Sequence, residues 1–124
     1  MPRVLIADDE ESMRTLVARA VAMDGHETVT AEDGAEALEI LIREAGAFDL
    51  LLTDIQMPVM DGIALALTVA RDFPDLTILL MTGFADQRER AHGLNAIVHD
   101  VVTKPFSVAD IRTAVAQALA ARKG

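Results

Sequence analysis

The sequence predicts an α/β protein built on a doubly wound parallel sheet of five strands with five helices. Short apolar segments alternate with longer segments whose apolar residues recur at helical spacing. The connections between them are only a few residues long, which favours parallel strands with helices on both faces of the sheet. Five such units most often adopt the strand order 2-1-3-4-5, in which the first and third strands are neighbours. We expect a single domain over residues 1–124, because no linker, repeat or low-complexity segment interrupts the alternation.

The expected elements follow from segment length and apolar spacing. Strands are predicted at residues 4–7, 27–30, 48–54, 76–81 and 96–102. Helices are predicted at about residues 13–23, 35–42, 63–70, 85–93 and 108–119. The segment 85–93 is the weakest of these patterns, because it is rich in charge and its apolar residues are not periodic.

Several helix boundaries carry recognisable end signals. Gly25 follows the first helix and is typical of a helix stop. Asp33, with Glu36 three residues later, resembles a capping box, and Ser107 is a second N-cap candidate. Pro74 disfavours helical backbone at the residue before it, which ends the third helix.

Composition excludes several classes of function. The net charge of −9 opposes binding to nucleic acid, which depends on Lys and Arg neutralising phosphates. The absence of Cys excludes thiol catalysis, zinc sites with Cys ligands and disulfides, and it permits a reducing compartment. No apolar segment approaches the ~20 residues of a membrane span, and the N-terminus lacks the apolar run of a signal peptide. We therefore expect a cytoplasmic protein without membrane contacts.

The candidate functional residues all follow directly after predicted strands. They are Asp8 and Asp9 after the first, Asp54 after the third, Thr82 after the fourth and Lys104 after the fifth. Each alone has an ordinary explanation as a turn or first-turn acid, a loop hydroxyl or a surface lysine. However, the carboxyl ends of parallel strands share one edge of the sheet, where ligands bind in open α/β folds. Their coincidence at that edge favours a common site.

The chemistry of this set indicates a metal-assisted phosphoryl acceptor. Clustered carboxylates repel one another and raise each other's pKa unless a cation lies among them. Oxygen ligands suit a hard cation, so we expect Mg²⁺, with Mn²⁺ as an alternative. Asp54 is the expected nucleophile, and Asp8 and Asp9 are expected to hold the metal. A lysine and a hydroxyl would then bind the oxygens of the transferred phosphoryl group.

At these residues the chain resembles the receiver domains of two-component response regulators, from end to end. The resemblance implies a flavodoxin-like fold and a phosphorylation switch rather than an enzyme with turnover. The matching segments are Asp8-Asp9, Asp54-Ile55-Gln56-Met57-Pro58, Asp61-Gly62, Thr82-Gly83 and Lys104-Pro105-Phe106.

The resemblance also implies roles for single residues. Asp54 would accept the phosphoryl group from a sensor histidine kinase or a histidine phosphotransfer protein. Asp9, Asp54 and the backbone carbonyl of Gln56 would ligate Mg²⁺, and Asp8 would act through water. Thr82 and Lys104 would sense the phosphoryl group, and the Lys104-Pro105 peptide bond would be cis.

One departure from the family concerns the coupling between the site and the outer face. The family usually has an aromatic residue three positions before the lysine, where this chain has Val101. Coupling must then be weaker or use other groups, and Phe84 and His99 are candidates. Phe84 and Gln56 also occupy positions that flank the path of attacking water, so we expect them to tune the phosphoryl lifetime.

The expected output is binding to a downstream target protein in trans, because the chain stops shortly after the last predicted helix. The expected surface is formed by the fourth and fifth helices and the fifth strand. The Thr82-Gly83-Phe84-Ala85 segment is similar to the CpdR-type cell-cycle receivers that control regulated proteolysis.

Two other classes of function compete with this reading. A metal-dependent phosphatase with true turnover remains an alternative, although its type places Asp-x-Asp after the first strand rather than adjacent acids. A flavodoxin-like cofactor carrier would need a hydroxyl-rich phosphate loop, where this chain has four acids.

Overall fold

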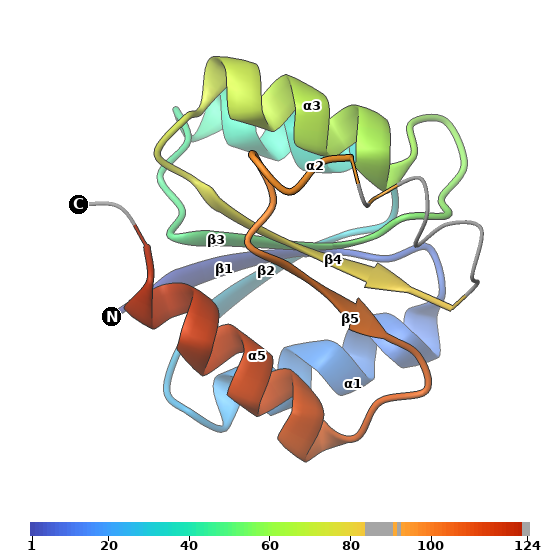
Figure 1. Cartoon of the computed structure of the whole chain (residues 1–124), viewed down its shortest axis with the longest axis vertical. Coiled ribbons are helices and arrows are strands. Elements are labelled where there is room, and N and C mark those ends of the chain that lie inside the picture. The colour runs from blue at the N-terminus through green and yellow to red at the C-terminus, as the bar shows by residue number, and fades with distance from the viewer. Residues whose placement is uncertain (84–90, 92, 123–124) are drawn as a thin grey trace.

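The computed structural model of the chain describes residues 1–83, 91 and 93–122. Five parallel strands form one sheet in the order β2-β1-β3-β4-β5, as predicted (Figure 1). The strands are β1 (Arg3–Ala7), β2 (Glu27–Ala31), β3 (Leu50–Asp54), β4 (Thr77–Thr82) and β5 (Asp100–Thr103). The described residues contain four helices, α1 (Glu11–Ala22), α2 (Gly34–Arg43), α3 (Gly62–Asp72) and α5 (Val108–Ala120). The helix predicted at 85–93 falls almost wholly outside the described residues.

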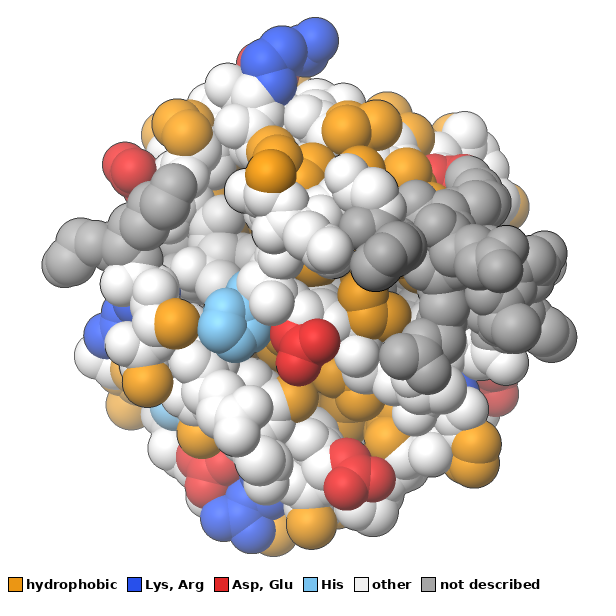
Figure 2. All heavy atoms as spheres, viewed as in Figure 1, with side chains coloured by type: hydrophobic (Ala, Val, Ile, Leu, Met, Phe, Trp, Pro, Cys, Tyr) orange, Lys and Arg blue, Asp and Glu red, His pale blue; other side chains and the backbone are white. Residues whose placement is uncertain are grey.

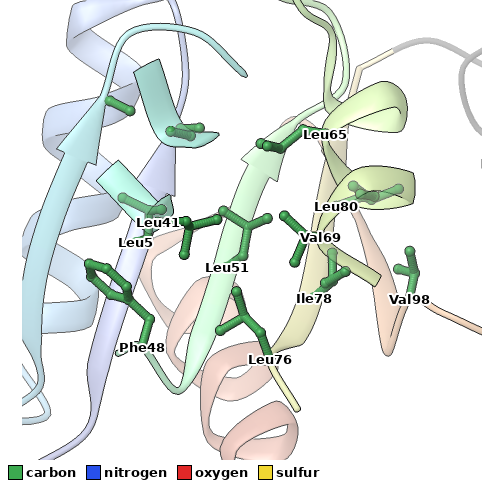
Figure 3. Close-up of a cluster of buried hydrophobic side chains, with 14 of the residues drawn as sticks. Leu5, Leu41, Phe48, Leu51, Leu65, Val69, Leu76, Ile78, Leu80 and Val98 are labelled. Carbon is green, nitrogen blue, oxygen red and sulfur yellow. The ribbon is translucent and has the colours of Figure 1, made fainter. Parts of the chain in front are cut away.

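The helices cover both faces of the sheet. In Figure 1, α2 and α3 lie on one face, and α1 and α5 lie on the other. Each face has its own cluster of buried hydrophobic side chains, and Figure 3 shows the cluster beneath α2 and α3. None of the described helices is both long enough and apolar enough to cross a membrane.

β3 is the central strand, and its burial explains its sequence. Leu51 packs into the cluster beneath α2 and α3, whereas Leu50 and Leu52 pack into the cluster beneath α1 and α5. All three side chains are fully buried, and each such leucine contributes roughly 1.5–3 kcal/mol of apolar burial. The strand therefore holds Asp54 firmly at its carboxyl end.

The helix caps agree with the predicted signals in most details. The Ser107 and Asp110 side chains form a complete capping box at α5. The Asp33 side chain caps α2 by accepting from the Glu36 amide at 2.8 Å. The second bond of a capping box, from the Asp33 amide to the Glu36 carboxylate, is not formed. Asp61 caps α3 by accepting from the Ala64 amide at 2.8 Å, a cap that was not predicted from the sequence.

The fifth strand is shorter than predicted. It begins at Asp100 rather than at residue 96. The amides of Ile97 and Val98 both bond to the Leu94 carbonyl at 2.9 Å, so the preceding segment is a local turn. Hydrogen bonding to β4 begins only at His99, whose amide donates to the Ile78 carbonyl at 2.8 Å.

Two glycines allow the loop after β3 to pack closely. A Cβ at Gly62 would lie 2.0 Å from the Asp54 carbonyl oxygen, and a Cβ at Gly34 would lie 2.3 Å from the Met60 carbonyl oxygen. Both are closer than non-bonded atoms can approach. The N-termini of α2 and α3 are therefore packed directly against the backbone that follows Asp54.

We predict that Gly62→Ala destabilises the protein by at least about 1–3 kcal/mol, because rigid backbone must move to admit the methyl group. Urea unfolding followed by far-UV circular dichroism measures this, since the chain has no Trp or Tyr. Gly93→Ala is the control, because nothing lies within 4 Å of its Cβ position. Equal loss of stability in the two variants would contradict the packing explanation.

Candidate functional site

Three carboxylates meet where β1 and β3 end. Asp8 and Asp9 follow β1, Asp54 ends β3, and the two strands are hydrogen-bonded neighbours. One carboxylate oxygen from each residue lies within 4.8 Å of the others. Asp8 is completely buried and Asp54 is 6% exposed, whereas Asp9 is exposed. The predicted acidic cluster is therefore present, and it opens to solvent on the Asp9 side.

Lys104 supplies a positive charge to this cluster. Its Nζ lies 3.2 Å from Asp54 Oδ1 and 3.6 Å from Asp8 Oδ2. The side chain is 19% exposed, so the ammonium group reaches into the site from its rim. Its stem runs along Gly83, where a Cβ would lie 3.8 Å from the Lys104 Cβ and Cδ.

The loop between β1 and α1 is held by bonds to Asp8. The Asp8 amide donates to the Ala31 carbonyl at 3.1 Å, and Asp8 Oδ1 accepts from the Glu10 amide at 2.9 Å. Arg14 Nη1 donates to the Asp8 carbonyl at 2.8 Å. Arg14 was not among the candidate residues in the sequence. The one feature that could have identified it is its positive charge near the start of a helix, where the helix dipole favours acidic residues.

Burial governs the protonation of the two inner carboxyls. Desolvation raises the pKa of Asp54 to about 6, the attraction of Lys104 opposes this shift, and the repulsion of Asp8 adds to it. Desolvation also raises the pKa of Asp8, against the lowering effect of the Glu10 amide and Lys104. One lysine therefore does not fully compensate the two buried carboxylates.

The donor set fits a hard divalent cation. Asp8 Oδ2 is buried and accepts no hydrogen bond from the residues that the structure describes, although it faces Lys104 Nζ at 3.6 Å. Carboxylate oxygens are the ligands that Mg²⁺ prefers, and the exposed side of the cluster leaves room for the waters that Mg²⁺ retains. The unsatisfied oxygen and the raised pKa of Asp54 both indicate that a cation would stabilise this cluster.

The end of β4 lies beside the cluster. Asp54 pairs in register with Met81, so Thr82 stands one residue further along, at the same edge of the sheet. Thr82 is fully buried, and its carbonyl accepts from the Lys104 amide at 2.7 Å. The Lys104-Pro105 bond is cis, as the resemblance implied.

The remaining candidate residues are placed less centrally. Gln56 is exposed in the loop two residues after Asp54. Val101 is half-buried and packs against the cluster beneath α2 and α3. His99 lies at the amino end of β5, four register positions from the Thr82 pair, so it does not reach the site. Phe84 falls outside the described residues.

Comparison with known proteins identifies relatives over nearly the whole chain. The family model described as "Response regulator receiver domain" matches residues 4–116. The response regulator receiver protein CpdR of Brucella abortus is 39% identical over 111 residues, which cover 90% of this chain and 91% of CpdR. The probable transcriptional regulator ycf27 of Guillardia theta is 35% identical over 113 residues, which cover 91% of this chain and 43% of ycf27. ycf27 and several other curated relatives are about twice as long as the part that they share with this chain.

Solved structures show the same architecture. The chemotaxis response regulator CheY4 of Vibrio cholerae is 28% identical with a TM-score of 0.83, covering 95% of this chain and 98% of CheY4. The response regulator TrrA of Thermotoga maritima, solved in complex with Mg²⁺ and BeF, is 30% identical with a TM-score of 0.83, covering 94% of this chain and 98% of TrrA.

The family match, these identities and the acidic cluster at the end of β1 and β3 lead to one conclusion: the chain belongs to the response regulator receiver domains of two-component signalling.

Proposed function

We propose that this receiver domain is a phosphorylation switch whose acceptor is Asp54. The observation that carries the proposal is the position of its carboxylate, within 4.8 Å of the Asp8 and Asp9 oxygens and 3.2 Å from Lys104 Nζ. The phosphoryl donor is a sensor histidine kinase or a histidine phosphotransfer protein. Receiver domains are generally signalling switches, so a phosphatase with turnover is not proposed.

The reaction is a displacement at phosphorus. A carboxylate oxygen of Asp54 attacks, a P–O bond forms, and the P–N bond to the donor histidine breaks, leaving the electron pair on the imidazole nitrogen. Mg²⁺, when bound, neutralises charge on the transferred oxygens. Asp9, Asp54 and the Gln56 carbonyl would hold the ion, and Asp8 would act through water. The Lys104 ammonium would move from Asp54 to a phosphoryl oxygen, and the Thr82 hydroxyl would donate to another.

Phosphorylation would act on partner binding through charge and local repacking. The phosphoryl group adds roughly −1.5 to −2 charges, and Lys104 links the site to the cis peptide that follows β5. The output is proposed to be a protein contact in the cytoplasm, on the surface of β5, α5 and the helix that the sequence predicts at 85–93. Similarity to CpdR supports the narrower proposal of a CpdR-type receiver that controls regulated proteolysis.

Direct binding to DNA is not part of the proposal. The net charge is −9, and on the coloured part of the face shown in Figure 2 basic side chains are scattered rather than gathered into a patch. The curated relatives described as transcriptional regulators are longer than the part that they share with this chain. Their activity on DNA is therefore not transferred to this domain.

We predict that the wild-type chain incubated with acetyl phosphate and Mg²⁺ gains one labile phosphoryl adduct, measured by intact mass spectrometry. Asp54→Asn should gain none, because the amide is not a nucleophile. Asp75→Asn, at an exposed position, is the matched control and should react like the wild type. An unchanged adduct in Asp54→Asn, or steady phosphate release without an adduct, would overturn the proposal.

We predict that Mg²⁺ binding depends on the buried and the exposed acid after β1. Asp8→Asn and Asp9→Asn should each weaken Mg²⁺ affinity by about 10-fold or more, which corresponds to about 1.4 kcal/mol. Isothermal titration calorimetry provides the measurement, with Asp75→Asn again as control. Affinities equal to the wild type in both variants would remove the cluster as the metal site.

We predict that the metal-free protein loses stability as the pH rises from about 4 to about 6. The pKa of Asp54 is about 6 in the folded state and 3.8 in the unfolded reference, so the folded state binds the proton more tightly and the gain disappears above its folded pKa. Asp54→Asn should therefore have a higher unfolding midpoint than the wild type at pH 8 in EDTA, and the difference should shrink towards pH 4.

Added Mg²⁺ provides the control for this prediction. At a concentration ten times the dissociation constant, Mg²⁺ should stabilise the wild type by about 1.4 kcal/mol at pH 8. It should stabilise Asp54→Asn much less, because one carboxylate ligand is missing. If the wild type and Asp54→Asn show the same pH profile in EDTA, the raised pKa of Asp54 does not influence stability.

A further inference from the structure

The outer face of α2 carries an apolar hollow that the site does not use. Ala35, Leu38 and Ile42 line it from α2, and Met60 lines it from the loop between β3 and α3. Its volume is about 380 Å³. The Ile42 side chain is 65% exposed, which is unusual for a large aliphatic residue on a helix that also buries the opposite face.

The hollow is a fixed feature of the fold. The Gly34 amide donates to the Met60 carbonyl at 3.1 Å, which joins the start of α2 to the loop that carries Met60. Leu38 and Met60 are also packed against the buried cluster beneath α2 and α3. The floor of the hollow is therefore held by the core, and Ile42 is the one exposed residue among its apolar lining residues.

Two opposite charges border this apolar surface. Glu39 and Arg43 are exposed members of the lining, one helical turn apart. Neither side chain makes an ion pair or hydrogen bond with another residue in the described part of the chain. By contrast, Glu44, next along the chain, pairs with Arg3 at 2.8 Å.

We propose that this surface, the α2 face defined by Ala35, Leu38, Glu39, Ile42, Arg43 and Met60, binds the same surface of a second copy of the chain. Two copies of α2 related by a two-fold axis perpendicular to the helix run antiparallel. An axis level with residue 41 places Glu39 of each copy opposite Arg43 of the other, because the two residues are about 6 Å apart along the helix. The charge pattern is therefore self-complementary.

The same arrangement brings the apolar residues of the two copies into contact. Ile42 lies about 1.5 Å along the helix from the axis level, so the two Ile42 side chains approach each other at the centre and each faces the other copy's hollow. The charged pairs then lie at the rim. This is the usual division of an interface into an apolar centre and a polar border.

A second copy explains the surface better than an acidic or a basic partner. A strongly basic partner would pair with Glu39 but would repel Arg43, and an acidic partner would do the reverse. Only a surface that presents one charge of each sign at this spacing satisfies both residues. The net charge of −9 on each copy is screened over about 8 Å at physiological salt, so it does not prevent close local contacts.

Sedimentation equilibrium of the unphosphorylated chain tests this proposal. At about 0.15 M salt, the weight-average mass should rise from 13.3 kDa towards twice that value as the protein concentration increases. The highest concentration is about 1 mM, which suffices to detect a dimer with a dissociation constant of about 1 mM. Ile42→Glu should keep the chain monomeric. Met23→Glu is the matched control, because Met23 is 61% exposed at the end of α1, on the opposite face of the sheet, and it should dimerise like the wild type.

Charge reversal provides a second test that a structural defect cannot imitate. Glu39→Arg and Arg43→Glu should each weaken dimerisation about 10-fold or more, because each places two like charges opposite one another twice per dimer. The double variant should recover to within about 3-fold of the wild type. A mass of 13.3 kDa at every concentration, a dimer that Ile42→Glu leaves intact, or a double variant as weak as the singles would each overturn the proposal.

Discussion

The concentration of negative charge at the carboxyl edge of the sheet is the constraint on which the rest of the site depends. The Asp8 and Asp54 carboxyls are buried, and Asp9 adds a third carboxylate within 4.8 Å. Burial is the main reason why the pKa of Asp54 is raised to about 6, the attraction of Lys104 opposes this shift, and the repulsion of Asp8 adds to it. The arrangement costs stability in the metal-free fold. A bound divalent cation would supply the favourable interactions that these carboxylates lack.

The surrounding fold holds this unfavourable cluster in place. β3 anchors Asp54 between two buried hydrophobic layers, and Gly62 lets α3 begin directly against the backbone of Asp54. At the other end of the sheet, Arg3 joins three elements, because it pairs with Glu27 and Glu44 and lies 4.4 Å from the centre of the Phe48 ring. Arg3 thus connects β1 to β2, to the end of α2 and to the segment before β3 at the amino edge of the sheet.

The reasoning from sequence succeeded where a residue's role depends on its own strand. Asp8, Asp54, Thr82 and Lys104 each follow an apolar segment, and parallel strands bring their ends to one edge, so their proximity followed from the pattern. The fifth strand was predicted too long, because apolar composition cannot distinguish a strand from the local turn at 94–98. Arg14 was missed, since its bond to the Asp8 carbonyl reflects how the loop folds and not a motif.

The amino-acid sequence by itself indicated the alternation of strands and helices, the acidic pair, the candidate residues at the strand ends and the family, because these depend on hydrophobic period and on residue types at strand ends. Only the tertiary structure decided how the residues interact. His99 precedes β5, four residues before Thr103, which pairs with Thr82. The Lys104 ammonium group lies near the carboxylates of both Asp8 and Asp54. Glu39 and Arg43 border an exposed apolar surface of α2. These outcomes depend on side-chain packing between elements distant in the chain, and no local sequence pattern encodes that packing.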